Sequence, residues 1–171
     1  RNRSFPKRNI SQNELIGILD RNNIHQNIIK SISILSKNMK LANFQIRSTE
    51  QILNSLSKNI VSGNLISAGT GSGKTLGFYF ACLGQISSNI FRNIRNDHWL
   101  QCLSIYPRTE LLKDQLNSIY AEARKLDEFL KSNGKRKISV GALYFDVPEN
   151  NYYVQEKWKK IGEDYVCPFL T

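Results

Sequence analysis

One short segment, residues 68–75, constrains the fold more than any other part of the chain. It reads Ala-Gly-Thr-Gly-Ser-Gly-Lys-Thr, so glycines alternate with small polar residues ahead of a lysine and a threonine. Glycine tolerates positive φ and lets the backbone come close to an anion, so several N–H groups can point at one phosphate. An apolar run precedes this segment and a helical pattern follows it, which is the context of a phosphate-binding loop (P-loop).

Each position of this loop has an expected role in binding a nucleoside triphosphate. The backbone amides and the first turn of the following helix surround the phosphates. Lys74 reaches the β- and γ-phosphates, and the Thr75 hydroxyl coordinates Mg²⁺, so these two are also the predicted catalytic residues. The predicted site residues of the loop are Gly69, Thr70, Gly71, Ser72, Gly73, Lys74 and Thr75.

The pattern around the loop alternates strand and helix. Apolar runs at residues 65–68, 101–106 and 138–145 predict strands, and residues 73–86 and 110–130 predict helices, with a loop or short helix at 87–99 and a turn at 132–137. This order predicts an α/β fold with a parallel sheet flanked by helices, whose ligand binds at the carboxyl ends of the strands.

The N-terminal part, residues 1–43, is basic and predicted to be helical. Ser11 and Glu14 have the spacing of a capping box, which predicts a helix from there. Apolar residues at helical spacing predict a second helix over 24–38, and a third begins near Ser48.

The charge balance points to a polyanionic partner. The chain has 24 Lys and Arg against 14 Asp and Glu, a formal net charge of +10. Nucleic acid is the commonest partner of such a protein, an anionic membrane surface is the alternative, and a solvated basic surface is the third interpretation. The apolar runs are shorter than the ~20 residues that span a bilayer. The basic start leads into no signal peptide, so we expect a cytoplasmic protein without a membrane partner.

The three cysteines show no metal-binding spacing within the chain. Cys82 and Cys102 lie in apolar surroundings and are predicted to be buried thiols, which fits a reducing compartment. Cys167 precedes a proline near Thr171, and it is the one candidate zinc ligand, with its partners beyond the chain end.

Two motifs resemble those of superfamily 2 helicases, the DEAD/DEAH-box group. The form A-x-T-G-S-G-K-T, with Ala68 at its first position, is similar to their motif I. Residues 106–115 fit Y-P-x-x-x-L-x-x-D-Q, which resembles motif Ia in a branch of bacterial helicases of the Lhr and MrfA types. The resemblance implies that Arg108 and Thr109, at a helix N-terminus, contact the nucleic-acid backbone, and an ordinary strand-to-helix turn is the alternative.

A third resemblance concerns the base of the nucleotide. Gln51 lies 23 positions before Lys74, similar to the Q motif of these helicases, in which a glutamine reads adenine. A side-chain amide offers both donors and an acceptor for that purpose. Arg47, close by, is expected to stack on the base. The alternative is that Gln51 is a solvated helix residue.

The resemblance implies that residues 44–148 form a truncated RecA-like domain of an ATP-dependent DNA or RNA helicase. ATP and Mg²⁺ are its implied cofactors, and a second RecA-like domain is its implied partner. Residues 149–171 would lead into a missing part, so the chain alone would be inactive. Asp127 and Glu128 are interpreted as a solvated helix face. Asp146 is either part of a turn or a Walker B carboxylate. In the second case the chain is a P-loop NTPase of another class, a kinase or an AAA-type protein, and not a helicase. A nucleic-acid-binding module with a vestigial P-loop is the third hypothesis for the chain.

Overall fold

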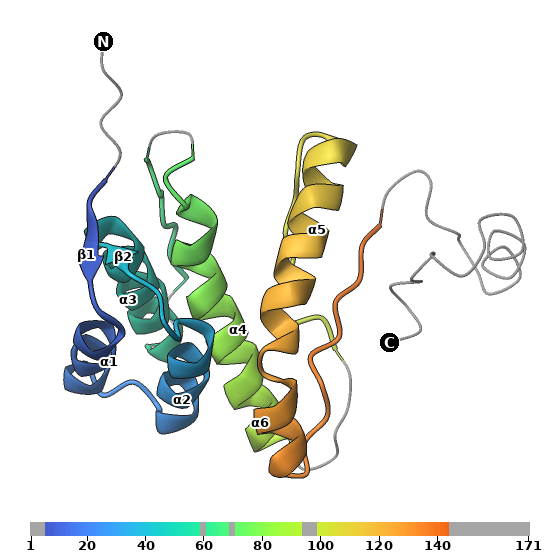
Figure 1. Ribbon diagram of the computed structural model, residues 1–171. Helices are drawn as coiled ribbons and strands as arrows, with labels where there is room; N and C mark the ends of the chain where they lie inside the picture. The colour runs from blue at the N-terminus through green and yellow to red at the C-terminus, as the bar shows by residue number, and fades with distance from the viewer. Residues whose placement is uncertain (1–5, 59–60, 69–70, 94–98, 144–171) are drawn as a thin grey trace, which may run out of the picture.

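Helices dominate the structure, a computed structural model that describes residues 6–58, 61–68, 71–93 and 99–143 (Figure 1). One small antiparallel sheet joins β1 to β2, with Arg8 opposite Ala42 and Ile10 opposite Leu41. The elements of the described residues are β1 (Arg8–Ile10), α1 (Gln12–Arg21), α2 (Gln26–Leu35), β2 (Leu41–Ala42), α3 (Asn43–Ser57), α4 (Lys74–Arg92), α5 (Thr109–Arg124) and α6 (Asp127–Ser132).

The N-terminal helices largely follow the prediction. The Ser11 N–H donates to Glu14 Oε2 over 2.7 Å, and the Glu14 N–H donates to Ser11 Oγ over 3.3 Å, which is the predicted capping box of α1. Helix α2 lies within the predicted range. Helix α3 begins at Asn43, five residues earlier than predicted, because the Gln45 side chain reaches back and accepts the Ala42 N–H over 2.9 Å. That contact compensates for an N-cap residue without a polar side chain.

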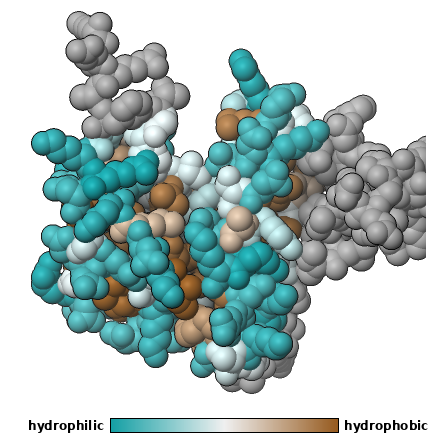
Figure 2. Space-filling view, in the orientation of Figure 1, coloured by the Kyte–Doolittle hydropathy of each residue, from teal (hydrophilic) through white to brown (hydrophobic). Residues whose placement is uncertain are grey.

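Helix α4 is the centre of the core and packs against both α2 and α3. A Cβ added at Gly84 would lie 3.0 Å from Ile28 Cγ2, so α4 and α2 approach closely there. The hydroxyls of Ser31 and Ser87 hydrogen-bond across the same contact over 2.9 Å. The helix continues to Arg92, beyond its predicted end, because its last turns stay buried against the core. Figure 2 shows apolar residues between the helices and polar residues over the outer surface.

The second half of the chain contains a broken helix where one helix was predicted. Helix α5 ends at Arg124, and α6 starts two residues after the break at Lys125. Asp127 pairs with Arg124 at 3.5 Å and with Lys137 at 3.4 Å, and it lies in α6 as expected, not after a strand. The predicted turn is present at Gly134, whose φ is +66°.

The predicted parallel sheet does not form among the described residues. Segments 61–68, 99–106 and 135–143 contain no strand, and the one sheet described is antiparallel. Leu65 and Ile105 on two of these segments are 96% and 85% exposed. A strand makes its hydrogen bonds only with a neighbouring strand, whereas segments 61–68 and 135–143 lie on opposite sides of the α4–α5 pair (Figure 1). The apolar pattern of these segments predicts strands, but strand pairing also depends on which segments lie next to each other in the fold.

Candidate functional site

The predicted phosphate-binding loop has the backbone that its glycines were expected to allow. Gly71 and Gly73 have φ values of +76° and +84°, in the left-handed region that favours glycine. Helix α4 starts immediately afterwards at Lys74, with Gly73 as its N-cap. Because glycine has no side chain, it does not cap the first amides of α4. The positive end of the helix dipole therefore faces the loop.

Two side chains of the loop, those of Lys74 and Ser72, carry polar groups that could contact a phosphate. Lys74 Nζ donates to the Ala68 carbonyl over 2.6 Å, so the lysine folds over its own loop. The Ser72 hydroxyl is buried and has no hydrogen-bond partner within the part of the chain that the structure describes. A buried hydroxyl without a partner is costly, and a phosphate oxygen would satisfy it. Thr75 follows in the first turn of α4 and is partly exposed. Gly69 and Thr70 lie outside the described residues.

Two residues that the sequence did not single out support the outer side of the loop. Gln45 Nε2 donates to the Gly73 carbonyl over 2.8 Å. An Arg8 guanidinium nitrogen donates to the Ser72 carbonyl over 3.3 Å. In a loop whose amides point inward to an anion, the carbonyls face outward and cannot bind the anion. The Arg8 and Gln45 side chains donate hydrogen bonds to two of these outward carbonyls. Pairing of Arg8 with Ala42, next to α3, places both donors together.

These two residues differ in how far the sequence could have revealed them. Gln45 is a polar residue in an apolar face of α3, between Phe44 and Ile46, and it is 1% exposed. A buried glutamine at such a place is a recognisable signal, because buried polar groups need partners. Arg8 carries no comparable signal, since it is one of many basic residues and its contact spans 64 positions.

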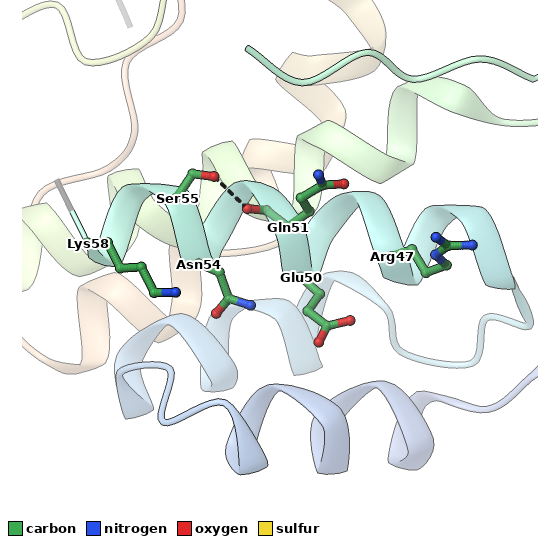
Figure 3. A pocket seen from close by; sticks show the side chains of 6 residues that line it. All are labelled: Arg47, Glu50, Gln51, Asn54, Ser55 and Lys58. Atoms are coloured by element: carbon green, nitrogen blue, oxygen red, sulfur yellow. Dashed lines mark hydrogen bonds between the residues drawn. The ribbon is translucent and has the colours of Figure 1, made fainter. Parts of the chain in front are cut away.

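The predicted adenine-reading residues lie elsewhere on α3. Gln51 is exposed and lines an open hollow on the outer face of the helix (Figure 3). Gln51 and Ser55 project from one side of α3, while Glu50 projects from the other, where it accepts the Asn22 amide over 2.8 Å. The structure brings Gln45, rather than Gln51 or Arg47, against the loop. The hollow is lined by Arg47, Glu50, Gln51, Asn54, Ser55 and Lys58.

The motif Ia-like turn lies at the same end of the helical layer as the loop. Arg108 is the exposed N-cap of α5, and Thr109 is its first residue. The Tyr79 hydroxyl donates to the Gln115 side chain over 3.0 Å, which ties the early turns of α4 and α5 together. Burial, followed by a hydrogen bond with Tyr106, raises the pKa of Tyr79 well above its usual range, so the hydroxyl keeps its proton. The two helices run side by side in the same direction, and both N-termini attract anions (Figure 1).

Several predictions concern residues or groups that the structure leaves untested. Asp146 and Cys167 lie outside the described residues, so neither the Walker B nor the zinc hypothesis is tested. Among the described residues, no group of three or more His, Cys, Asp or Glu could hold a metal ion. Thr75, in the first turn of α4, is the residue of the loop that could hold a Mg²⁺ ion together with phosphate oxygens. No described helix has the length and apolar character needed to cross a membrane.

Comparison with known proteins supplies the family. A family model for the DEAD/DEAH box helicase matches residues 42–145, more than half of the chain. The match spans the loop, Gln45 and the start of α5. It favours the helicase interpretation over a kinase or an AAA-type protein. Neither the curated proteins nor the solved structures gave a match. Helicases of this family use ATP with Mg²⁺ and bind nucleic acid. Because the matching family model covers more than half of its residues, the chain belongs to the DEAD/DEAH box helicase family.

Proposed function

We propose that this chain is the nucleotide-binding part of an ATP-dependent helicase or translocase of DNA or RNA. Residues 44–148 would form the RecA-like region, residues 1–43 a helical N-terminal segment and residues 149–171 a C-terminal segment. Segments 65–68, 101–106 and 138–145, which are unpaired where the structure describes them, would be strands of a parallel sheet in the complete RecA-like domain. A second RecA-like domain would complete the ATP-hydrolysing helicase. The carrying observation is the loop itself, with two left-handed glycines, a lysine folded over it and a buried serine hydroxyl without a described partner.

Binding of ATP follows from a small rearrangement of this loop. Lys74 Nζ exchanges the Ala68 carbonyl for phosphate oxygens, and the Ser72 hydroxyl gains an acceptor. Arg8 and Gln45 keep their hydrogen bonds to the outward carbonyls, so the loop retains its shape. Mg²⁺ neutralises phosphate charge when it is bound. Because Gly71, Gly73 and the first turn of α4 already have the conformation that binds phosphate, this part of the loop loses little conformational entropy on binding.

The assignment of the loop is tested with the Lys74→Ala variant. Calorimetric titration with Mg-ATP should show binding to the wild-type chain and none to the variant. Lys30→Ala, on the exposed side of α2, removes the same charge away from the loop and serves as the control. Circular dichroism of both variants checks that the helices remain. Unchanged ATP binding by Lys74→Ala would rule out the P-loop assignment.

Two glutamines of α3 have different proposed roles toward the nucleotide. Gln51, with Arg47 stacking on the base, reads adenine. It lies six residues beyond Gln45, about 9 Å further along the helix axis. Gln45 holds the loop through its contact with the Gly73 carbonyl. Gln51→Ala should therefore remove the preference for ATP over GTP. Gln45→Ala should instead lower the affinity for ATP and for GTP by the same factor. A lost preference in Gln45→Ala alone would transfer the adenine-reading role to Gln45.

The nucleic-acid contact is proposed for the N-terminus of α5. Arg108 is exposed there and Thr109 opens the helix, so a backbone phosphate would meet a cation and unpaired amides. Arg108→Ala should weaken binding of single-stranded nucleic acid and lower the salt slope, d log K/d log[salt], by about one unit. Lys30→Ala should leave both nearly unchanged. Equal effects of the two variants would mean that binding depends on net charge and not on this turn.

A further inference from the structure

The N-terminal strand β1 contacts the phosphate-binding loop by two routes. The direct route is the hydrogen bond of 3.3 Å that the Arg8 guanidinium donates to the Ser72 carbonyl. The indirect route passes through β2, where Ala42 pairs with Arg8 and donates its N–H to Gln45 Oε1 over 2.9 Å. Gln45 Nε2 in turn donates to the Gly73 carbonyl over 2.8 Å. Two adjacent carbonyls of the loop are therefore held by β1 and by the helix that follows its partner strand.

These two carbonyls belong to the peptide groups at the start of α4. The Ser72 carbonyl shares its peptide group with the Gly73 N–H, and the Gly73 carbonyl shares its peptide group with the Lys74 N–H. Gly73 is the N-cap and Lys74 the first residue of α4, so both N–H groups lie where a helix N-terminus binds phosphate. A hydrogen bond to the carbonyl polarises the peptide group and makes its N–H a stronger donor. Arg8 and Gln45 therefore strengthen two amides of the phosphate site from the carbonyl side.

Strand β1 is short and can open without the rest of the N-terminal segment. It is three residues long, its pairing with β2 is irregular between Arg8 and Ile10, and Arg8 and Asn9 are exposed. A two-stranded ribbon is marginally stable in water. Helix α1, which follows, is anchored in the core by Leu15 and Leu19, both fully buried. Strand β1 can therefore open locally while α1 stays packed.

We propose that docking of β1 and binding of ATP at the loop stabilise each other, with Arg8 as the positioning residue that couples them. The inference rests on the proposed function, because it requires ATP at the loop. The hydrogen bond from Arg8 to Ser72 exists only while β1 is docked, so opening of the strand leaves the peptide group between Ser72 and Gly73 less polarised.

Coupling between the two events is reciprocal. The factor by which the docked strand raises ATP affinity is the factor by which ATP favours the docked strand. Loss of one charge-assisted hydrogen bond predicts a factor of about five to ten. The N-terminal strand is thereby an element that responds to the nucleotide, although it lies more than 60 positions before the loop in the sequence.

Hydrogen exchange of the full chain tests the coupling. The amides of residues 8–10 should exchange about five- to tenfold more slowly with saturating Mg-ATP than without nucleotide. The amides of α6, at the end of the helical layer away from the loop, should exchange equally in both conditions (Figure 1). If calorimetry shows ATP binding but the exchange of β1 does not slow, the coupling is refuted and the proposed function stands. If calorimetry shows no ATP binding, the proposed function fails and the coupling fails with it.

Variants of β1 separate the role of Arg8 from that of the strand as a whole. In Arg8→Gln, Mg-ATP should no longer slow the exchange of residues 8–10, while circular dichroism should show that the helices remain. Asn9→Ala is the matched control, because Asn9 is the exposed neighbour on the same strand, and it should keep the full effect of ATP. Each variant is compared with and without ATP, so differences in intrinsic exchange rate cancel. A full effect in Arg8→Gln, or equal losses in the two variants, would overturn the role of Arg8.

A conservative replacement tests whether a charged donor is needed. Arg8→Lys keeps the positive charge and a donor, so it should restore part of the ATP-dependent protection that Arg8→Gln loses. An effect of ATP in Arg8→Lys no greater than in Arg8→Gln would count against the hydrogen bond to the Ser72 carbonyl as the coupling contact.

Discussion

Gly73→Ala tests the close packing around the phosphate-binding loop. A Cβ at this position would lie 2.8 Å from Gln45 Nε2 and 2.9 Å from an Arg8 guanidinium nitrogen, closer than real Cβ contacts allow. The residue also has a φ of +84°. An alanine there costs about 1–2 kcal/mol for the left-handed backbone. Displacement of Gln45 from the Gly73 carbonyl costs about 1 kcal/mol more.

The expected total cost of Gly73→Ala is about 2–3 kcal/mol. It can appear as a lower free energy of unfolding or, if the loop distorts to relieve the contacts, as weaker ATP binding. Both are measured: the free energy of unfolding by urea titration, and ATP affinity by calorimetry. Because the carbonyls of Ser72 and Gly73 lose their donors, we expect ATP affinity to fall by at least tenfold.

Gly134→Ala is the matched control. Gly134 also has a left-handed φ, +66°, but a Cβ there meets nothing within 4 Å. The Gly134→Ala variant should lose only the stability that a left-handed alanine costs, about 1–2 kcal/mol, and its ATP affinity should be unchanged. The difference between the two variants isolates the contacts with Gln45 and Arg8. If both variants lose the same stability and neither loses ATP affinity, the proposed support of the loop is refuted.

Three further predictions address separate parts of the molecule. Gly17→Ala in α1, where a Cβ meets nothing within 4 Å, should stabilise the chain by about 1 kcal/mol in urea titration, whereas Gly84→Ala, 3.0 Å from Ile28 Cγ2, should not; equal gains would contradict the tight α2–α4 contact. Hydrogen bonds from Ser11 lower the pKa of Glu14 below its value in the unfolded chain. The ionised Glu14 therefore adds to the free energy of unfolding above the ordinary carboxyl range, and this contribution is lost as the pH falls through the folded pKa. Glu14→Gln should remove that part of the pH dependence of unfolding, and an unchanged pH profile would count against the capping box. Arg8→Gln should weaken ATP binding about five- to tenfold, through loss of one charge-assisted hydrogen bond, while the neighbouring Lys7→Gln should not; equal losses would indicate a general effect of charge.

Local features of the fold could be predicted from the sequence because their cause is local. The capping box of α1 and the turn at Gly134 depend on residues within four positions of one another. The loop is of the same kind, since alternating glycines and a helix N-terminus define a phosphate-binding backbone. Its predicted role in binding ATP is a proposal that the sequence motif and the loop geometry both support.

The boundaries of the helices were less predictable, because burial decides them. Helix α4 extends to Arg92 because Ser87 and Ile90 are buried against the core, although that stretch looks polar in the sequence. Helix α3 starts at Asn43 because the Gln45 side chain accepts the Ala42 N–H. Intrinsic propensity alone is a weak guide where packing or a side-chain contact can override it.

Only the tertiary structure decided which distant residues meet. Arg8 reaches Ser72 across 64 positions, and Tyr79 of α4 reaches Gln115 of α5 across 36 positions. The sequence identified apolar runs for a parallel sheet, but their pairing is not local, and the described residues leave these runs unpaired. A hydrogen bond or a strand ladder needs both partners within about 3 Å. That proximity is set by the path of the whole chain, whereas the sequence around each partner sets only its local conformation.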